Sequence, residues 1–249
     1  DAIQCLRWVA AAARRTQQLT LWLRPALLPL VQRRLALPPH GRLRAWPEGL
    51  QPWCQGLPHL PLMSLPLALG LAGAALAAEV PLLRGPGPGA APVGRPRRIG
   101  LVWAAGRKED PEANRQARQR SLPLQALLEV LKPLRERGLV VLQPLQVGPD
   151  AHEAEAFPSL LEPAPPLAHW EATAQQLERL DGLISVDTAV AHLAGSLGLP
   201  TWLLLPEPCD WRWGRTGQSS SWYRSVRLVR GADGGSVLRA LQQALEQWI

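Results

Sequence analysis

The sequence has little cysteine and no arrangement of residues that is typical of a metal site. Its three cysteines, Cys5, Cys54 and Cys209, lie far apart in 249 residues, and no two of them form a CxxC pair. This pattern excludes a disulfide-rich scaffold and a zinc ribbon, and it is typical of a reducing compartment, so we predict a cytoplasmic protein. The five histidines also lack the spacing of metal ligands, so we expect neither a metal nor another cofactor.

Lysine is also scarce, although the chain as a whole is basic. Only two of the 27 basic residues are lysine, and the formal net charge is +7. The arginines are scattered, form no run of five or six, and do not alternate with aromatic side chains, which argues against a nucleic-acid-binding protein. A basic surface of this kind suits a phosphate-bearing small molecule as a partner.

Long uncharged runs are few, and the candidate for a membrane span is residues 60–78, which carry no charge over 19 residues. Because this segment contains two prolines and two glycines and is rich in alanine, we interpret it as a buried helix rather than a stable membrane span. Peripheral contact is then the only membrane contact that we expect. The sequence has neither a starting methionine nor a basic-then-apolar leader, so we interpret it as a segment of a longer protein.

Glycine and proline gather at residues 84–98, where each occurs four times. Such a segment forms neither a helix nor a central strand, and domain boundaries commonly fall in segments of this composition. We therefore predict an N-terminal half over residues 1–88, a linker over 89–98 and a C-terminal half over 99–249. In the N-terminal half we expect helices at 2–15, 25–35 and 65–78, a strand at 18–23 and a loop over 37–62.

Short apolar strands alternate with helices in the predicted C-terminal half. We expect strands at 99–103, 139–142, 182–186, 201–205 and 226–229, and helices at 123–137, 169–180, 188–197 and 236–248. The stretches 104–120 and 148–166 are predicted to be irregular. Continuous apolar strands separated by helices indicate a buried parallel sheet, so this half is predicted to be an α/β domain of the Rossmann type.

Polar residues follow the third of these strands at the edge where parallel sheets bind ligands. Asp187 ends the strand and Thr188 begins the next helix. The backbone N–H groups of Thr188, Ala189 and Val190 would therefore face an anion. His192 shares the helix face of Thr188. The alternative is an N-cap aspartate with a buried histidine behind it, and spacing alone does not separate the two.

Two further groups follow other predicted strands. Arg120 lies directly before the predicted helix 123–137, whose N-cap we expect to be Ser121, so its position is fixed and it is a candidate phosphate ligand. The basic residues before Arg120 also fit a loop exposed to solvent. Asp210 and Trp211 belong to a Trp-Arg-Trp loop after strand 201–205. Such a loop either stacks on a base or sugar or packs on the core, and both interpretations remain open.

Three stretches in the C-terminal half resemble one known family. They are IGLVWAAGR…RSLPL, LISVDTAVAHLAGSLGLPTWLLLPEPCDWRW and SSWYRSVRLVR. They resemble the glycosyltransferase-like domain of bacterial tetratricopeptide-repeat proteins, which is similar to the lipopolysaccharide heptosyltransferases of glycosyltransferase family 9. In the first third, DAIQCLRW and LMSLPLALG resemble the family's motifs more weakly. The resemblance implies a GT-B fold, in which two Rossmann-like halves enclose a substrate cleft.

The resemblance also implies an activity, the inverting and metal-independent transfer of a sugar from a nucleotide-diphosphate sugar to a hydroxyl of a glycan or protein. It assigns the catalytic base to Asp1 and donor binding to Arg120, Asp187, Thr188, Ala189, Val190, His192, Asp210 and Trp211. Because the family's first strand precedes the base, we expect the N-terminal half to be incomplete. The alternatives are a degenerate, non-catalytic binding module of a larger tetratricopeptide-repeat protein and a GT-B enzyme of another class, such as a nucleotide-sugar 2-epimerase, which needs further carboxylates.

Overall fold

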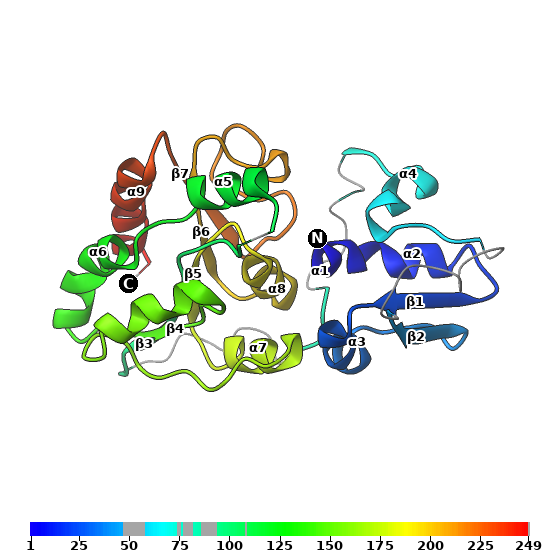
Figure 1. Ribbon diagram of the computed structural model, residues 1–249, viewed down its shortest axis with the longest axis horizontal. Coiled ribbons are helices and arrows are strands. Elements are labelled where there is room, and N and C mark those ends of the chain that lie inside the picture. Colours follow the sequence, from blue (N-terminus) through cyan, green and yellow to red (C-terminus); the bar gives the residue numbers. More distant parts are fainter. Residues whose placement is uncertain (47–57, 74–75, 77–81, 86–93, 108, 249) are drawn as a thin grey trace.

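The protein has two unequal lobes (Figure 1). The computed structural model describes residues 1–46, 58–73, 76, 82–85, 94–107 and 109–248. Among these residues, the N-terminal lobe contains a two-stranded sheet and the C-terminal lobe contains a five-stranded sheet. Every strand pair in both sheets is parallel, as expected for an α/β protein.

The sheet of the C-terminal lobe has the strand order β4-β3-β5-β6-β7. Its strands are β3 (Arg97–Val102), β4 (Val140–Pro144), β5 (Gly182–Val186), β6 (Thr201–Pro206) and β7 (Val226–Gly231). All residues of β5 and β6 are buried, as in strands that are covered on both faces. The predicted parallel sheet is confirmed. β3 starts inside the predicted linker because the Arg97 backbone N–H already bonds to the Leu139 carbonyl of the neighbouring chain segment.

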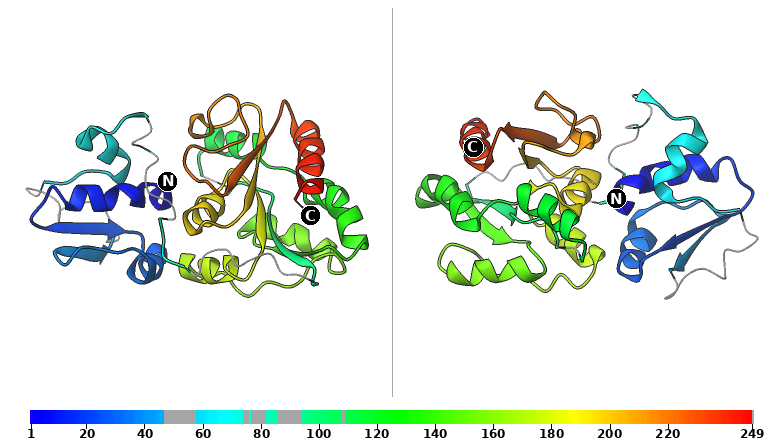
Figure 2. Two further views of the ribbon diagram at one scale, coloured as in Figure 1. Left: turned by 180° about the vertical axis from the view of Figure 1, so that it is seen from behind. Right: turned by 45° about the horizontal axis from the view of Figure 1, so that its top comes forward.

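Helices cover both faces of this sheet (Figure 2). α6 (Leu124–Glu136) and α9 (Gly234–Glu246) supply leucines to the core on one face, and α7 (Trp170–Leu177) and α8 (Ala189–Leu197) supply the other. The chain moves outward from β3 to β4 and then returns to β5 on the other side of β3. Ligands of such sheets bind at the carboxyl ends of the strands near this change of direction.

The N-terminal lobe combines one interrupted helix with the smaller sheet. The helix consists of α1 (Ala2–Cys5), a 3-10 turn (Leu6–Trp8) and α2 (Val9–Ala13). β1 (Leu19–Leu23) pairs with β2 (Gly41–Ala45), and between them lie a 3-10 turn (Pro25–Leu27) and α3 (Leu28–Arg34). A further turn (Leu62–Ser64) leads into α4 (Leu65–Leu69). None of the helices in the described part of the chain has the length and hydropathy needed to cross a membrane.

Two segments that were predicted to be loops contain regular structure. β2 lies within the expected loop 37–62, and Leu43 is the only large apolar residue of this strand, so no hydrophobic run marks it. α5 (Pro111–Gln119) lies within the expected loop 104–120. The Asp110 carboxylate accepts a hydrogen bond from the Ala113 N–H at 2.6 Å, and Asp-Pro-Glu is a helix-start signal that outweighs the polarity of the segment.

The helix predicted over 65–78 is shorter in the structure. It ends at Leu69 because Gly70 adopts a left-handed conformation with φ of 67°, which terminates helices. Residues 74–75 and 77–78 lie outside the described residues, as do residues 86–93 of the predicted linker region. Within the stretch 148–166, Pro149–Ala156 forms a 3-10 helix.

The two lobes touch through buried side chains as well as through the chain connection. α1 packs against α8, and α3 packs against α7. Beside the first contact, Trp8 of the 3-10 turn lies edge-on to Trp222 of the loop before β7, with ring centroids 6.4 Å apart. At the second, the Arg34 guanidinium binds the carboxylates of Glu171 and Glu178. The position of the N-terminal lobe is therefore tied to the helices that flank the ligand edge of the large sheet.

Candidate ligand site at the carboxyl edge of the large sheet

A cavity of about 300 Å³ lies where β5 and β6 end and α5 covers the edge of the sheet. Its walls come from three chain segments: α5 with the residue that ends it, the residue directly after β5, and the end of β6 with the loop that follows it. The lining residues are Glu112, Gln116, Gln119, Arg120, Asp187, Leu205, Pro206, Pro208, Cys209 and Asp210. Three of the site residues predicted from the sequence, Arg120, Asp187 and Asp210, therefore share one cavity.

Arg120 reaches the cavity from a fixed position at the end of α5. The Ser121 hydroxyl accepts a hydrogen bond from the Ala105 N–H at 3.0 Å and donates one to the Ala117 carbonyl at 2.7 Å. Next to it, the Leu122 N–H bonds to the Trp103 carbonyl. These bonds fasten the end of α5 to the segment that follows β3. Ser121 was predicted to be the N-cap of the next helix, but the N-cap of α6 is Pro123. Ser121 instead anchors Arg120 through the turn at the end of α5.

Arg120 and Asp187 face each other across the cavity, with Nη1 and Oδ2 3.5 Å apart. The Nε of Arg120 is buried and has no hydrogen-bond partner among the described residues. A buried donor without a partner is costly, and an anionic ligand would supply the missing acceptor for this guanidinium. Of the two side chains, the Arg120 guanidinium is therefore the one that can bind an anion, whereas Asp187 can accept hydrogen bonds.

Burial raises the pKa of the Asp187 carboxyl, and the positive charge of Arg120 offsets part of this rise. The side chain of Asp187 is only 11% exposed. A carboxylate in such a place accepts hydrogen bonds strongly, because few water molecules compete for it. Among the described residues, no group of three or more His, Cys, Asp or Glu side chains is arranged to hold a metal ion.

The N-terminus of α8 begins directly after Asp187. Thr188 is the N-cap, with extended backbone angles, but its side chain does not cap the helix. Instead, the Thr188 Oγ1 lies 3.1 Å from the Ser185 Oγ. The first-turn N–H groups of Ala189 and Val190 therefore keep the partial positive charge of a helix start. Of this segment only Asp187 lines the cavity, and Thr188, Ala189 and Val190 do not.

His192 lies one turn further along α8 and is buried. Its Nδ1 is 2.9 Å from the Tyr223 hydroxyl, and its ring stacks on Trp213 with centroids 5.1 Å apart. Burial lowers the pKa of His192 to about 3, so the ring is neutral at physiological pH. The structure places His192 behind the cavity rather than in its wall, and its role toward a ligand stays a prediction.

The loop after β6 connects the cavity to the N-terminal lobe. Asp210 lines the cavity, whereas the Trp211 side chain is exposed and lies over the Arg212 guanidinium, 5.1 Å from it. Arg212 binds Asp210 and also Asp1 of the other lobe. Asp1 is not among the residues that line the cavity, but this arginine joins it to the cavity wall.

Sequence reasoning missed several residues of this region. It overlooked the wall provided by Glu112, Gln116 and Gln119, since α5 was expected to be a loop. It also overlooked Arg212, although the Trp-Arg-Trp motif was noticed, because the Asp1 contact joins residues that are 211 positions apart.

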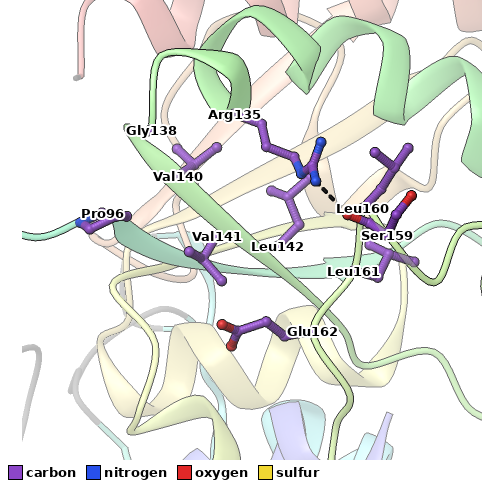
Figure 3. Close-up of a pocket in the computed structure, with 10 residues that line it drawn as sticks. All are labelled: Pro96, Arg135, Gly138, Val140, Val141, Leu142, Ser159, Leu160, Leu161 and Glu162. Carbon is purple, nitrogen blue, oxygen red and sulfur yellow. Dashed lines mark hydrogen bonds between the residues drawn. The ribbon is translucent and has the colours of Figure 1, made fainter.

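A second cavity, of about 380 Å³, lies beside the edge strand β4, near the starts of β3 and β4 (Figure 3). Arg135 and Glu162 are the charged residues in its lining. Arg135 already donates to the Ser159 carbonyl, and Glu162 forms an ion pair with Arg98. Both charged side chains are thus bound to other residues of the protein, and the lining of this cavity has no set of polar groups that point to one place.

Comparisons with known proteins show a likeness of fold. No protein-family model matches the chain. No curated protein matches it. A solved structure of heptosyltransferase WaaC from E. coli with ADP-2-deoxy-2-fluoro heptose is similar over 100% of this chain and 96% of the WaaC chain, with 13% identity and a TM-score of 0.57. A second WaaC structure, with ADP, covers 63% of this chain and 44% of its own at 20% identity and a TM-score of 0.43. The first likeness shows a GT-B-like fold for this chain.

Proposed function

We propose that the protein is a glycosyltransferase that moves a sugar from a nucleotide-diphosphate sugar to an acceptor hydroxyl. The observation that carries this proposal is the meeting of Arg120 and Asp187 in one cavity at the carboxyl edge of the sheet. The N-cap of α8, Thr188, follows Asp187 directly in the chain. A cation, a helix start and a buried carboxylate together suit a ligand that combines a diphosphate with a hydroxyl-rich sugar. The GT-B-like fold supports the same conclusion.

Each part of the donor has a partner in the proposed complex. Arg120 and the first-turn N–H groups of α8 bind the diphosphate, and no metal ion is needed to balance its charge. Asp187 and Asp210 accept hydrogen bonds from sugar hydroxyls. The exposed ring of Trp211 offers a flat apolar surface to a sugar or base.

The transfer proceeds by a single displacement in this proposal. Asp1 takes the proton from the acceptor hydroxyl, the acceptor oxygen bonds to the anomeric carbon, and the bond from that carbon to the diphosphate oxygen breaks. A single displacement inverts the anomeric configuration. Arg120 and the α8 N-terminus stabilise the negative charge that develops on the departing nucleotide diphosphate. The Asp1 side chain is 57% exposed, so an acceptor can approach it.

Calorimetry with ADP, GDP, UDP and the sugars ADP-glucose, GDP-mannose and UDP-glucose tests donor binding. We expect the wild type to bind at least one of these pairs in the micromolar-to-millimolar range. Arg120→Ala should weaken binding of the bare diphosphate about 10- to 100-fold, because it removes a charge-assisted contact. Asp187→Ala should mainly reduce the preference for the sugar-bearing form.

Arg118→Ala is the matched control, since Arg118 is an exposed arginine of the same helix that does not line the cavity. It should bind nucleotides like the wild type. Absence of binding by the wild type, or equal binding by wild type and Arg120→Ala, would refute the donor site.

The second candidate function is a non-catalytic sugar-binding module of a larger tetratricopeptide-repeat protein. The place of Asp1 favours it, because the proposed base is not among the residues that line the donor cavity. The module would bind a nucleotide sugar without releasing the nucleotide diphosphate, whereas a transferase releases it. Measurement of nucleotide release therefore separates the two candidates.

A further inference from the structure

The guanidinium of Arg212 is held by three side chains from two lobes. Its Nε donates to the Gln4 Oε1 at 2.9 Å, and its Nη1 donates to both carboxylate oxygens of Asp210 at 2.9 Å. Its Nη2 donates to the Asp1 Oδ1 at 2.7 Å. A planar group that is bound along several edges has little freedom to move, so the geometry of this cluster is well defined.

The backbone of Arg212 is fixed as well. Its N–H donates to the Asp210 Oδ1 at 2.9 Å, and its carbonyl accepts a hydrogen bond from the Trp222 indole at 2.6 Å. Asp210 is in turn part of the cavity wall. Arg212 therefore holds a group bound to its other edge at a fixed distance from the cavity wall.

Asp1 is directed toward Arg212 rather than toward its own helix. It occupies the N-cap of α1, where an aspartate side chain ordinarily accepts a hydrogen bond from the helix start, yet it makes no such capping bond. Its carboxylate is instead bound by an arginine 211 residues away. The local stabilisation available to an N-cap aspartate is thus replaced by a contact between the lobes.

We propose that Arg212 is a positioning residue for the transfer step, which holds the Asp1 carboxylate at a fixed place relative to the donor cavity. This inference rests on the proposed function, in which Asp1 accepts the acceptor's proton. Arg212 shares its positive charge between Asp1 and Asp210, and it touches neither the donor nor the acceptor itself. Misplacement of a reacting group by about 1 Å can slow a reaction about 100-fold, so such a residue acts mainly on kcat.

Single-turnover release of nucleotide diphosphate, with water as the acceptor, tests this role. The substrate is whichever of ADP-glucose, GDP-mannose and UDP-glucose the wild type binds. Asp1→Asn should slow release about 100-fold because it removes the base. Arg212→Met should slow release at least about 10-fold through misplacement of that base, with dissociation constants for the nucleotide within about twofold of wild type.

The double variant separates positioning from general damage. If Arg212 acts through Asp1, Asp1→Asn combined with Arg212→Met should release nucleotide no more slowly than Asp1→Asn alone. Arg212→Lys keeps a charge but lacks the planar fork, so it should fold and show an intermediate rate. Arg230→Met is the control for general damage to the loop after β6. Arg230 donates to the carbonyls of Trp213, Gly214 and Gly217 and to the Cys209 Sγ, but it is not hydrogen-bonded to Asp1 or Asp210.

Several outcomes would overturn the inference. One is a rate for folded Arg212→Met or Arg212→Lys that is no lower than that of Arg230→Met. Another is a double variant whose loss equals the product of the two single losses. If Asp1→Asn is slow and Arg212→Met is fast, the inference fails while the proposed function stands. If the wild type releases no nucleotide, the proposed transfer fails and the role of Arg212 fails with it.

Discussion

Arg34 and Glu171 form a two-point ion pair between the lobes, although they are 137 positions apart in the chain. The Arg34 Nε lies 2.5 Å from Oε2, and Nη2 lies 2.9 Å from Oε1. Both side chains are 5% exposed. The neighbouring carboxylates of Glu171 and Glu178 raise the pKa of Arg34, so it carries its charge at all accessible pH values. The attachment of the N-terminal lobe therefore depends on a buried charge cluster.

Arg34→Met should destabilise the protein by about 3–5 kcal/mol, because it leaves the Glu171 carboxylate buried without its main counter-charge. The loss is measured as the free energy of unfolding in urea at pH 7. Arg33→Met is the control, since the Arg33 side chain is 69% exposed and its pair with Glu171 is worth at most about 1 kcal/mol. Equal losses for the two variants would contradict this account of the lobe interface.

Gly195→Ala should destabilise the protein by about 1–3 kcal/mol through overpacking. A Cβ at this position of α8 would lie 2.5 Å from the Cγ of the Tyr223 ring, which is itself buried. Gly235→Ala in α9 is the matched control, because its Cβ would meet no atom closer than 3.5 Å. This control should be neutral or stabilising by up to about 1 kcal/mol. Thermal unfolding of the two variants provides the comparison.

Asp187→Asn should be more stable than the wild type at pH 8 and lose that advantage near pH 4. Burial raises the folded-state pKa of Asp187 above its ordinary value of 3.8, so the folded wild type must ionise a buried group as the pH rises. The advantage of the variant should grow from pH 4 upward and level off above the raised pKa. Each unit of pKa difference corresponds to about 1.4 kcal/mol. Urea unfolding across this range measures it, and a pH-independent difference would refute the burial argument.

His192 should remain uncharged in the folded protein down to about pH 4. Its folded-state pKa, about 3, lies below the ordinary value of 6.5, so the unfolded chain binds more protons between these values. Stability due to this group is complete above pH 6.5 and falls as the pH drops toward 3, by up to about 1.4 kcal/mol per pH unit. Nitrogen chemical shifts of the His192 ring report its charge directly. A ring that titrates near pH 6.5 would place it in solvent.

The sequence predicted the large lobe well because its signals are local. β5 and β6 are continuous apolar runs, and each is followed by glycine, proline or a polar residue. The convergence of Arg120 and Asp187 followed from one geometric fact, that the carboxyl ends of parallel strands share an edge. α5 was missed because a polar surface helix with one buried residue, Ala117, has no apolar stripe to reveal it.

The remaining site could not be predicted from local patterns. The contact between Asp1 and Arg212 depends on how two lobes pack, which no spacing of residues encodes. The same holds for His192, whose spacing from Thr188 is compatible with either a ligand or a buried position. Its partner Tyr223 comes from a loop 31 positions later, and that hydrogen bond accounts for the buried orientation.

α5 forms one wall of the cavity yet is weakly attached to the rest of its lobe. Ala117 is its only buried residue, and the bonds at Asp110 and Ser121 hold its two ends. Backbone amides in such an element open to hydrogen exchange at a much lower free energy than those of β5. A ligand bound between Arg120 and Asp187 would make local opening of this helix less frequent, because it binds only the closed form. Slowed deuterium uptake in residues 111–119 would then report occupancy of the cavity, even for a ligand whose chemistry is unknown.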